Sequence, residues 1–391
     1  MLKYSNFAEL FFMDKLHFKN GKFKVMLVGD PHEKTVYNDK NEENKYSDYL
    51  ALQYAAIKAE KPDLVILMGD NATGATPDEV KRTLLRITKP YEENNIPFSF
   101  ILGNHDLECE VDDRETQYDI YREIPCCILP SKNEVNEFGD YTIPIYGEND
   151  APVFVIRHFY SGNHADPKYD SYYDFIDKAQ LDLYEKDAAN LKKTYGKTIP
   201  AVAVQHIPVP EIFEMLKERS FLSMAFDGVY GQNGHKGRFY TLDKKTGVKG
   251  YMGEAPCPPD HNGGEFDSWL KTGDIFAAFF GHDHMNDFVG MVRGIIIGMV
   301  KTASFHAYGD GLMQGVRIVE FNENDIRNIN TYMVRFRELI GSDCLSLHGS
   351  IKNLRDRTSV KLEFSLKAAA VAACAAAPFV LHRIIRKKKQ K

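Results

Sequence analysis

Short apolar runs, rich in β-branched and aromatic residues, recur along the chain, and a polar loop follows each of them. Uninterrupted runs of this length are typical of strands buried on both faces of a sheet. Helical stretches at residues 46–60, 77–94 and 178–195 separate several of the runs. The alternation predicts an α/β fold whose strand-end loops are free to carry chemistry. The runs are residues 23–28, 64–68, 98–102, 153–156, 199–204, 275–280, 295–300 and 316–321.

Two segments depart from this alternation. Residues 16–23 predict a hairpin, because Asn20-Gly21 is the preferred pair for a type I′ turn. Residues 227–264 are glycine- and proline-rich and weakly periodic, and a loop of this length in a compact domain is usually functional or disordered. We predict one domain over residues 1–340, with this long loop as a cap over the site, and a polar, then alanine-rich, then basic tail over residues 341–391.

Polar side chains of one chemical kind directly follow five of the predicted strands. Carboxylate, amide and imidazole groups suit Mn, Fe, Zn, Ni or Co, and no thiolate stands among them. Residues two apart, such as Asp30 and His32, leave an extended segment on the same side. One such residue alone is usually a cap or a loop residue, but five strand ends in order predict a metal site. The residues are Asp30, His32, Asp70, Asn104, His206, His282 and His284.

The order DxH, GD, GNHD, H and GHxH resembles the signature of the calcineurin-like metallophosphoesterases. The resemblance runs from about Lys22 to about Glu320. Residues 206–211, 253–258 and 280–287 are similar to a narrower branch, that of Dcr2-type phosphatases and purple-acid-phosphatase-like plant proteins. The resemblance implies a two-sheet mixed β-sandwich flanked by helices, in four α-β-β-α layers.

The resemblance also implies a role for each residue of the signature. Two divalent or trivalent ions would share Asp70, and a hydroxide bridging them would attack phosphorus in line. His105 would assist the leaving group, with Asp106 as its orienting partner. Asp283 is either a support for a neighbouring imidazole or a turn residue between two ligands. The first ion would take Asp30, His32 and His284, and the second Asn104, His206 and His282.

The sequence departs from true purple acid phosphatases at two positions. Thr73 stands where those enzymes have a tyrosine, and His32 stands where they have a glycine. We therefore expect a colourless site without tyrosinate.

Substrate contacts are less sharply indicated than metal ligands. Arg293, His306 and Tyr308 follow the last motif, and His235 lies in the long loop, so these four are the candidates. For His306, metal ligand, substrate contact and plain loop residue all stay open. His164 is expected to be a loop residue.

Charge and cysteine usage narrow the partners and the compartment. The net charge is −6, although the last nine residues hold six Lys or Arg and no acid. An acidic body disfavours binding of long nucleic acids, which need a basic face. The six cysteines form no CxxC pair, and the N-terminus lacks a signal-peptide pattern, so we expect reduced thiols and a cytoplasmic protein.

The tail leaves its relation to a membrane open. Residues 368–381 are uncharged but shorter than the roughly 20 apolar residues that span a bilayer. We expect either a solvated tail or peripheral membrane contact through residues 367–391, ahead of a true anchor.

Three functions follow from these patterns. The first is a phosphomonoesterase acting on a small phosphorylated molecule or a phosphoprotein. The second is a phosphodiesterase of the cyclic-nucleotide type, because the same metal centre supports both reactions. The third is a non-catalytic metal-binding module, tethered at a membrane by the basic tail.

Overall fold

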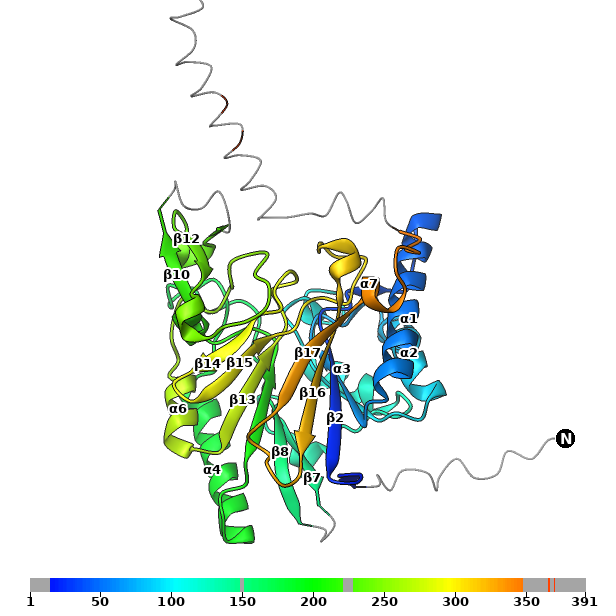
Figure 1. Ribbon diagram of the computed structural model, residues 1–391. Coiled ribbons are helices and arrows are strands. Elements are labelled where there is room, and N and C mark those ends of the chain that lie inside the picture. Colours follow the sequence, from blue (N-terminus) through cyan, green and yellow to red (C-terminus); the bar gives the residue numbers. More distant parts are fainter. Residues whose placement is uncertain (1–14, 148–150, 221–227, 347–364, 366–368, 370–391) are drawn as a thin grey trace, which may run out of the picture.

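The computed structural model describes residues 15–147, 151–220, 228–346, 365 and 369. Two mixed sheets pack face to face, and helices cover the outer face of each (Figure 1). The fold predicted from the sequence is confirmed, and all eight predicted strands are present.

The five-stranded sheet has the order β17-β16-β2-β4-β6. Strands β2, β4 and β6 are parallel, so their carboxyl ends lie at one edge. Helices α1, α2 and α3 belong to this side of the molecule (Figure 1). The strands are β2 Lys22–Val28, β4 Leu64–Met68, β6 Phe98–Ile101, β16 Gly315–Asn322 and β17 Asn330–Arg335; the helices are α1 Lys40–Glu60, α2 Pro77–Glu93 and α3 Arg114–Arg122, with the short α7 Phe336–Leu339 after β17.

The seven-stranded sheet has the order β1-β7-β8-β9-β13-β15-β14. Its central strands β8, β9, β13 and β15 are parallel, and helices α4 and α6 pack on its outer face. The strands are β1 Leu16–His17, β7 Tyr141–Tyr146, β8 Pro152–His158, β9 Ala201–Gln205, β13 Ile275–Phe280, β14 Val289–Val292 and β15 Ile295–Met299; the helices are α4 Lys178–Tyr195 and α6 Glu265–Thr272.

The core between the sheets is aromatic and aliphatic. Phe154 of one sheet stacks on Phe321 of the other, with ring centroids 4.5 Å apart. A second cluster, which includes the fully buried Trp269, fills the space between the seven-stranded sheet and its helices. Each sheet is thus covered on both faces, as its apolar runs require.

Local sequence signals set the helix ends. Thr76 accepts a hydrogen bond from the Glu79 N–H, and Pro77 opens α2. Asp177 caps α4 in the same way, and Gly196 ends it at φ 70°. Helix α4 has the predicted bounds, whereas α3 and α6 were not predicted.

The predicted hairpin is half right. Asn20 and Gly21 have φ 53° and 71°, so the turn forms, and Lys19 pairs with Lys22 across it. The first arm, however, leaves β2 and joins the other sheet, where β1 pairs in parallel with β7. The turn chemistry was local and predictable, and the partner strand was not.

The described part of the long loop contributes two strands, β11 and β12, to a small sheet. Strands β10 Leu216–Arg219, β12 Phe239–Leu242 and β11 Val229–Tyr230 form a three-stranded sheet. A two-stranded sheet pairs β3 Glu33–Lys34 with β5 Ala72–Thr73 and joins two loops of the strand-end edge.

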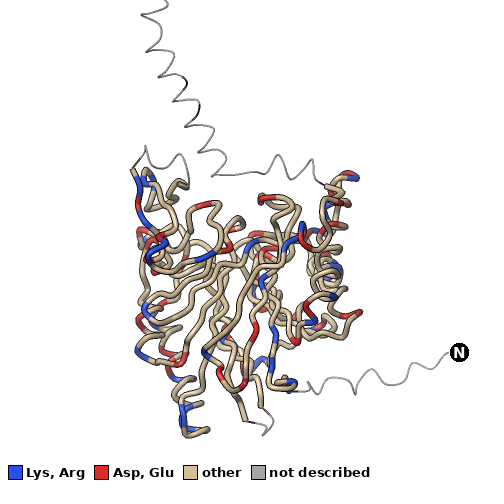
Figure 2. Tube along the Cα trace, viewed as in Figure 1, with Lys and Arg blue, Asp and Glu red and all other residues tan. Residues whose placement is uncertain are grey.

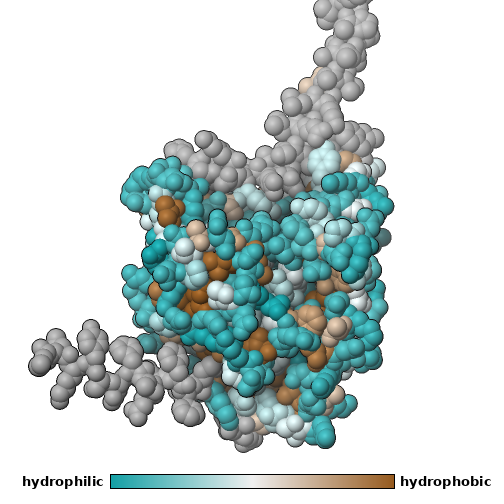
Figure 3. Space-filling view, turned by 180° about the vertical axis from the view of Figure 1, so that it is seen from behind, coloured by the Kyte–Doolittle hydropathy of each residue, from teal (hydrophilic) through white to brown (hydrophobic). Residues whose placement is uncertain are grey.

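Residues of both charge signs are interspersed along the described chain (Figure 2). The reverse face is mostly hydrophilic, with small separate hydrophobic areas (Figure 3). Within the described part of the chain, no helix is long and apolar enough to cross a membrane. Of the predicted tail, residues 341–346, 365 and 369 are described, and the rest lies outside the described residues.

Candidate metal centre

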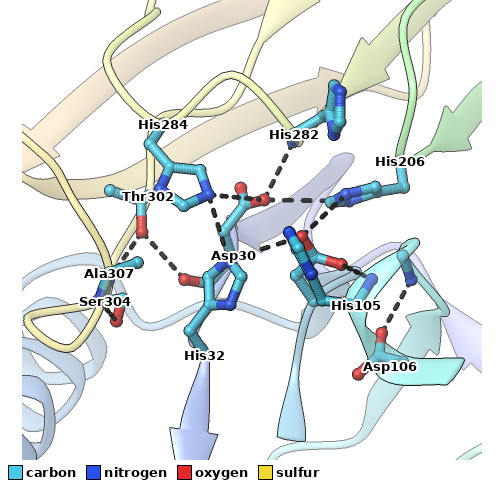
Figure 4. A network of polar contacts seen from close by, with 12 residues as sticks. Asp30, His32, His105, Asp106, His206, His282, His284, Thr302, Ser304 and Ala307 are labelled. Carbon is cyan, nitrogen blue, oxygen red and sulfur yellow. Dashed lines mark hydrogen bonds and ion pairs between the residues drawn. The ribbon is translucent and has the colours of Figure 1, made fainter. Parts of the chain in front are cut away.

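The seven predicted ligands follow the strands from which they were predicted. Asp30 and His32 follow β2, Asp70 follows β4 and Asn104 follows β6. The remaining three, His206, His282 and His284, follow β9 and β13 of the other sheet. Figure 4 labels Asp30, His32, His206, His282 and His284, which come from different elements, and shows the His206 and His284 rings beside the Asp30 carboxylate.

The carboxylates and imidazoles form two groups that share one residue. In each group, one potential ligand atom per residue lies within 4.8 Å of all the others. Shared Asp70 is the position expected of a bridging carboxylate. The first group is Asp30, His32, Asp70 and His284; the second is Asp70, His206 and His282.

Two histidines are held so that Nε2 faces the carboxylates. His206 Nδ1 lies 2.8 Å from the Met68 carbonyl, and His284 Nδ1 lies 3.0 Å from the Tyr308 carbonyl. Because a carbonyl can only accept, Nδ1 is the protonated nitrogen of the neutral ring, which leaves Nε2 as the nitrogen that can bind a metal ion. His206 Nε2 then lies 3.2 Å from Asp70 Oδ2. This is the tautomer that a metal ligand requires.

Three buried atoms of the cluster have no hydrogen-bond partner among the described residues. They are Asp30 Oδ2, Asn104 Oδ1 and His206 Nε2. An unpaired buried carboxylate oxygen or imidazole nitrogen is costly in a folded protein. All three are metal-ligating atoms, so the residues present fit a pair of cations.

The electrostatics of the cluster also favour added positive charge. Burial, with the charges of Asp70 and Glu254, raises the pKa of Asp30 well above its usual range. Burial alone would lower the pKa of His206, but the charges of Asp70 and Asp30 outweigh it and raise this pKa to about 10. Burial lowers the pKa of His32 to about 4, so that imidazole is neutral and can bind a metal ion.

The backbone carries strain at the same residues. Asp30, His32, Asp70 and His282 have φ of 45°, 45°, 51° and 71°, a region that residues with a Cβ rarely adopt. Strain of this kind collects at functional sites, where the surrounding structure maintains it. Gly103 allows the close approach, because a Cβ there would lie 2.2 Å from Asp70 Oδ1.

His105 lies at the mouth of the cluster and Asp106 lies beneath it. The His105 ring is half exposed, 5.3 Å from the His32 ring, and its backbone N–H donates to Asp70 Oδ1 at 2.8 Å. Glu108, not Asp106, is its partner: His105 Nδ1 lies 2.5 Å from Glu108 Oε2.

Asp106 instead fixes two loops to each other. Its carboxylate accepts the N–H groups of Asn71, Ala72 and Gly103 at 2.8, 3.1 and 2.7 Å. Burial and the neighbouring Asp70 raise its pKa to about 7. The predicted orienting role for Asp106 is therefore corrected: it positions the loops that carry Asp70 and Asn104.

The second half of the long loop forms part of the wall of the centre. Glu254 accepts the Met285 N–H at 2.9 Å and the Tyr308 hydroxyl at 2.8 Å. Asp283 accepts the Cys257 N–H, so it holds this loop and supports no imidazole. The loop therefore fixes the segment that carries His282 and His284.

The four substrate candidates lie in different places. Tyr308 stacks on the His284 ring at 4.2 Å and so backs the centre. His306 belongs to neither group of potential ligands, and its Nε2 lies 3.4 Å from Glu33 Oε1. His235 stacks on Phe213 beside the three-stranded sheet. Arg293 precedes β15, at the sheet end opposite the centre, and pairs with Glu214, so its prediction gains no support.

Sequence reasoning did not single out Glu108 or Tyr173. Glu108 pairs with His105 and also lies 3.5 Å from His164, a residue that the sequence predicts to be an ordinary loop residue. Tyr173 lies edge-on to the His282 ring at 4.5 Å. The three-residue spacing between His105 and Glu108 in a short helix, η1 His105–Leu107, was the one available signal.

A family model described as calcineurin-like phosphoesterase matches residues 23–286. The chain belongs to this family. The matched stretch contains the two groups and all the strands that carry them, so the calcineurin-like resemblance is confirmed. The Asp and His clusters are consistent with a dimetal site typical of this family.

Individual relatives of this calcineurin-like chain are distant. It is 27% identical over 330 residues to "Probable inactive purple acid phosphatase 14" of Arabidopsis thaliana, covering 77% of this chain and 75% of that one. It is 26% identical over 290 residues to "Phosphatase DCR2" of Saccharomyces cerevisiae, covering 68% of this chain and 45% of that protein. A solved dimetal phosphatase from Danio rerio aligns over 80% of this chain and 99% of its own at 10% identity, with a TM-score of 0.43.

Proposed function

We propose that this protein is a metal-dependent phosphomonoesterase. The observation that carries the proposal is the pair of groups sharing Asp70, with unpartnered ligand atoms buried between them. Asp30, His32, Asp70 and His284 would hold one ion, and Asp70, Asn104, His206 and His282 the other. When bound, two such ions lower the pKa of water and neutralise charge on phosphoryl oxygens.

The chain's own residues then position the reacting groups. Asp106 accepts backbone N–H groups from the loops that carry Asp70 and Asn104 and so holds both residues in place. The Met68 and Tyr308 carbonyls fix the orientation of the His206 and His284 rings. His105 lies at the mouth, and Glu108 contacts its Nδ1 and fixes the ring. In this proposal His105 donates a proton to the departing oxygen.

A non-catalytic function is the second candidate, because a relative carries the name "probable inactive". That reading predicts an incomplete ligand set. In this chain the ligand set is complete at every position of the signature, and the unpartnered atoms remain. We therefore place catalysis first, with phosphoesters as substrates.

The decisive experiment combines metal analysis with a substrate panel. The full chain is loaded with Mn²⁺ and assayed on 4-nitrophenyl phosphate and on bis(4-nitrophenyl) phosphate. We expect about two metal ions per chain, faster turnover of the monoester, and loss of activity of at least roughly a hundredfold in both Asp70→Asn and His105→Ala. Asp70→Asn should lose metal, whereas His105→Ala should retain it. Two bound ions with no turnover of any phosphoester would establish the non-catalytic function, and preference for the bis-ester would establish a diesterase.

A further inference from the structure

A loop of aromatic residues stands beside His105 and the second group of ligands. We define the aromatic loop as residues 161–175; three of its rings matter here, those of His164, Tyr172 and Tyr173. Tyr173 lies perpendicular to the His282 ring, with centroids 4.5 Å apart. His164 Nε2 lies 3.5 Å from Glu108, the carboxylate that also binds His105. The rings therefore form an arc from His105 round to His282.

The loop is held in a fixed shape. His164 pairs with Tyr173 across it, and the Asp174 N–H donates to the Asn163 carbonyl at 3.0 Å. Asp260 of the long loop accepts the Tyr172 N–H at 3.3 Å. Rings preorganised in this way lose little conformational entropy when a ligand packs against them.

Two of the rings are open to solvent although the residues that they contact, Tyr173 and Glu108, adjoin the centre. Tyr172 is 54% exposed, among the most exposed large hydrophobic residues described. The His164 side chain is 49% exposed and meets the Tyr172 ring edge-on at 5.0 Å. An exposed tyrosine and an exposed imidazole at a right angle present the surface on which a planar ring stacks.

The negative charge of Glu108 beside the His105 and His164 rings limits which charged groups the leaving group of a substrate can have. Glu108 lies between His105 and His164, with its two oxygens turned to the two rings. A leaving group with further phosphates or carboxylates would meet this carboxylate and be repelled. A neutral aromatic group meets no such penalty.

We infer that Tyr172 and His164 select phosphomonoesters with an uncharged aromatic leaving group, which stacks on the aromatic loop while its oxygen lies at His105. The inference rests on the proposed function and names its substrate class. Tyr172 and His164 are specificity-determining residues, and neither is a metal ligand.

The test compares benzyl phosphate with cyclohexylmethyl phosphate on the Mn²⁺-loaded full chain. Both release a primary alcohol of nearly the same size, so the ratio of their kcat/KM values reports on the planar ring. We expect the wild type to favour the benzyl ester roughly three- to tenfold. Tyr172→Ala and His164→Ala should bring the ratio toward one, and Tyr172→Phe should keep it. Tyr195→Ala removes a ring that is 40% exposed on α4, and should leave the ratio unchanged.

A binding measurement separates this inference from the proposed function. Titration calorimetry with benzylphosphonate and cyclohexylmethylphosphonate reports the same preference without turnover. Preferred binding of benzylphosphonate, lost in Tyr172→Ala, supports the inference even if no ester is hydrolysed, in which case the proposed function alone fails. Hydrolysis with equal ratios in wild type and Tyr172→Ala overturns the inference and leaves the proposed function standing. No hydrolysis and no difference between the phosphonates overturns both.

Discussion

Two clusters of buried charge lie near the end of β13, and they are built in opposite ways. In the ion network, which we define as Asp287, Lys301, Asp310 and Arg335, each acid faces a base. Asp287 Oδ2 lies 2.9 Å from Arg335 and 3.2 Å from Lys301, and Lys301 lies 2.7 Å from Asp310. In the metal centre, two carboxylates face imidazoles, and ligand atoms remain unpartnered.

The difference appears in the pKa values. Burial acts on Asp287, but Lys301 and Arg335 outweigh it and lower its pKa. Burial dominates at Asp30 and raises its pKa well above the usual range. None of the four residues of the ion network has positive φ, whereas Asp30 and Asp70 do. A charge balanced within the protein thus stabilises the fold, and one left unbalanced is available to a ligand.

The largest effect on stability should come from breaking the ion network. Asp287→Asn leaves buried Lys301 and partly buried Arg335 without their shared acid, so we expect the free energy of unfolding to fall by about 3 kcal/mol. The measurement is denaturant unfolding of the metal-free protein. Asp267→Asn, which removes an exposed partner of Arg293, should leave the free energy of unfolding nearly unchanged, because solvent screens this pair. Equal losses in the two variants would mean that the balanced charge of the network contributes nothing special.

The metal centre should respond with the opposite sign. Asp30→Asn keeps an oxygen for the His282 N–H and removes a buried, poorly balanced charge. We expect the metal-free variant to be more stable than wild type by about 1 kcal/mol at pH 7. Mn²⁺ at a hundred times its Kd should stabilise the wild type by about 2.7 kcal/mol and the variant much less. Unfolding with chelator and with Mn²⁺ measures both changes, and a metal-free variant less stable than wild type would contradict the comparison.

The sequence predicted what depends on local order. Each ligand follows its own strand by one to four residues, so a correct strand places it at the sheet edge, as with Asp70 after β4. The partner of His105 was predicted wrongly because adjacency favoured Asp106, whose oxygens are taken by backbone N–H groups. His164 comes to Glu108 across 56 positions of sequence, and β1 reaches β7 across about 130; neither pairing leaves a periodic signal. Long-range pairing of ordinary residues was therefore the part that could not be predicted.

A third buried carboxylate, Glu33, lies between the two extremes, and its effect depends on pH. Its hydrogen bonds come from neutral groups: its Oε1 accepts the Tyr37 hydroxyl at 2.5 Å and the Lys34 N–H at 3.0 Å. His306 Nε2 lies 3.4 Å away and is neutral at pH 7, because burial lowers the pKa of His306 to about 4, and the Arg86 and Lys34 cations offset burial of Glu33 only in part. Burial, with these hydrogen bonds opposing, raises its pKa from 4.5 to about 7. Between these values the folded protein binds a proton that the unfolded chain has lost, so stability falls as pH rises from about 4.5 to 7.

Glu33→Gln removes this titration and keeps an oxygen for both donors. We therefore expect the variant to gain stability relative to the wild type as pH rises from 5 to 8, by about 2 kcal/mol, in denaturant unfolding of the chelated protein. Glu43→Gln, at an exposed carboxylate on α1, provides the control and should show a flat difference. If the difference in unfolding free energy between Glu33→Gln and wild type also stays constant with pH, a positive charge near Glu33 must compensate its carboxylate. Glu33 would then resemble the balanced ion network and would not lie between the two clusters.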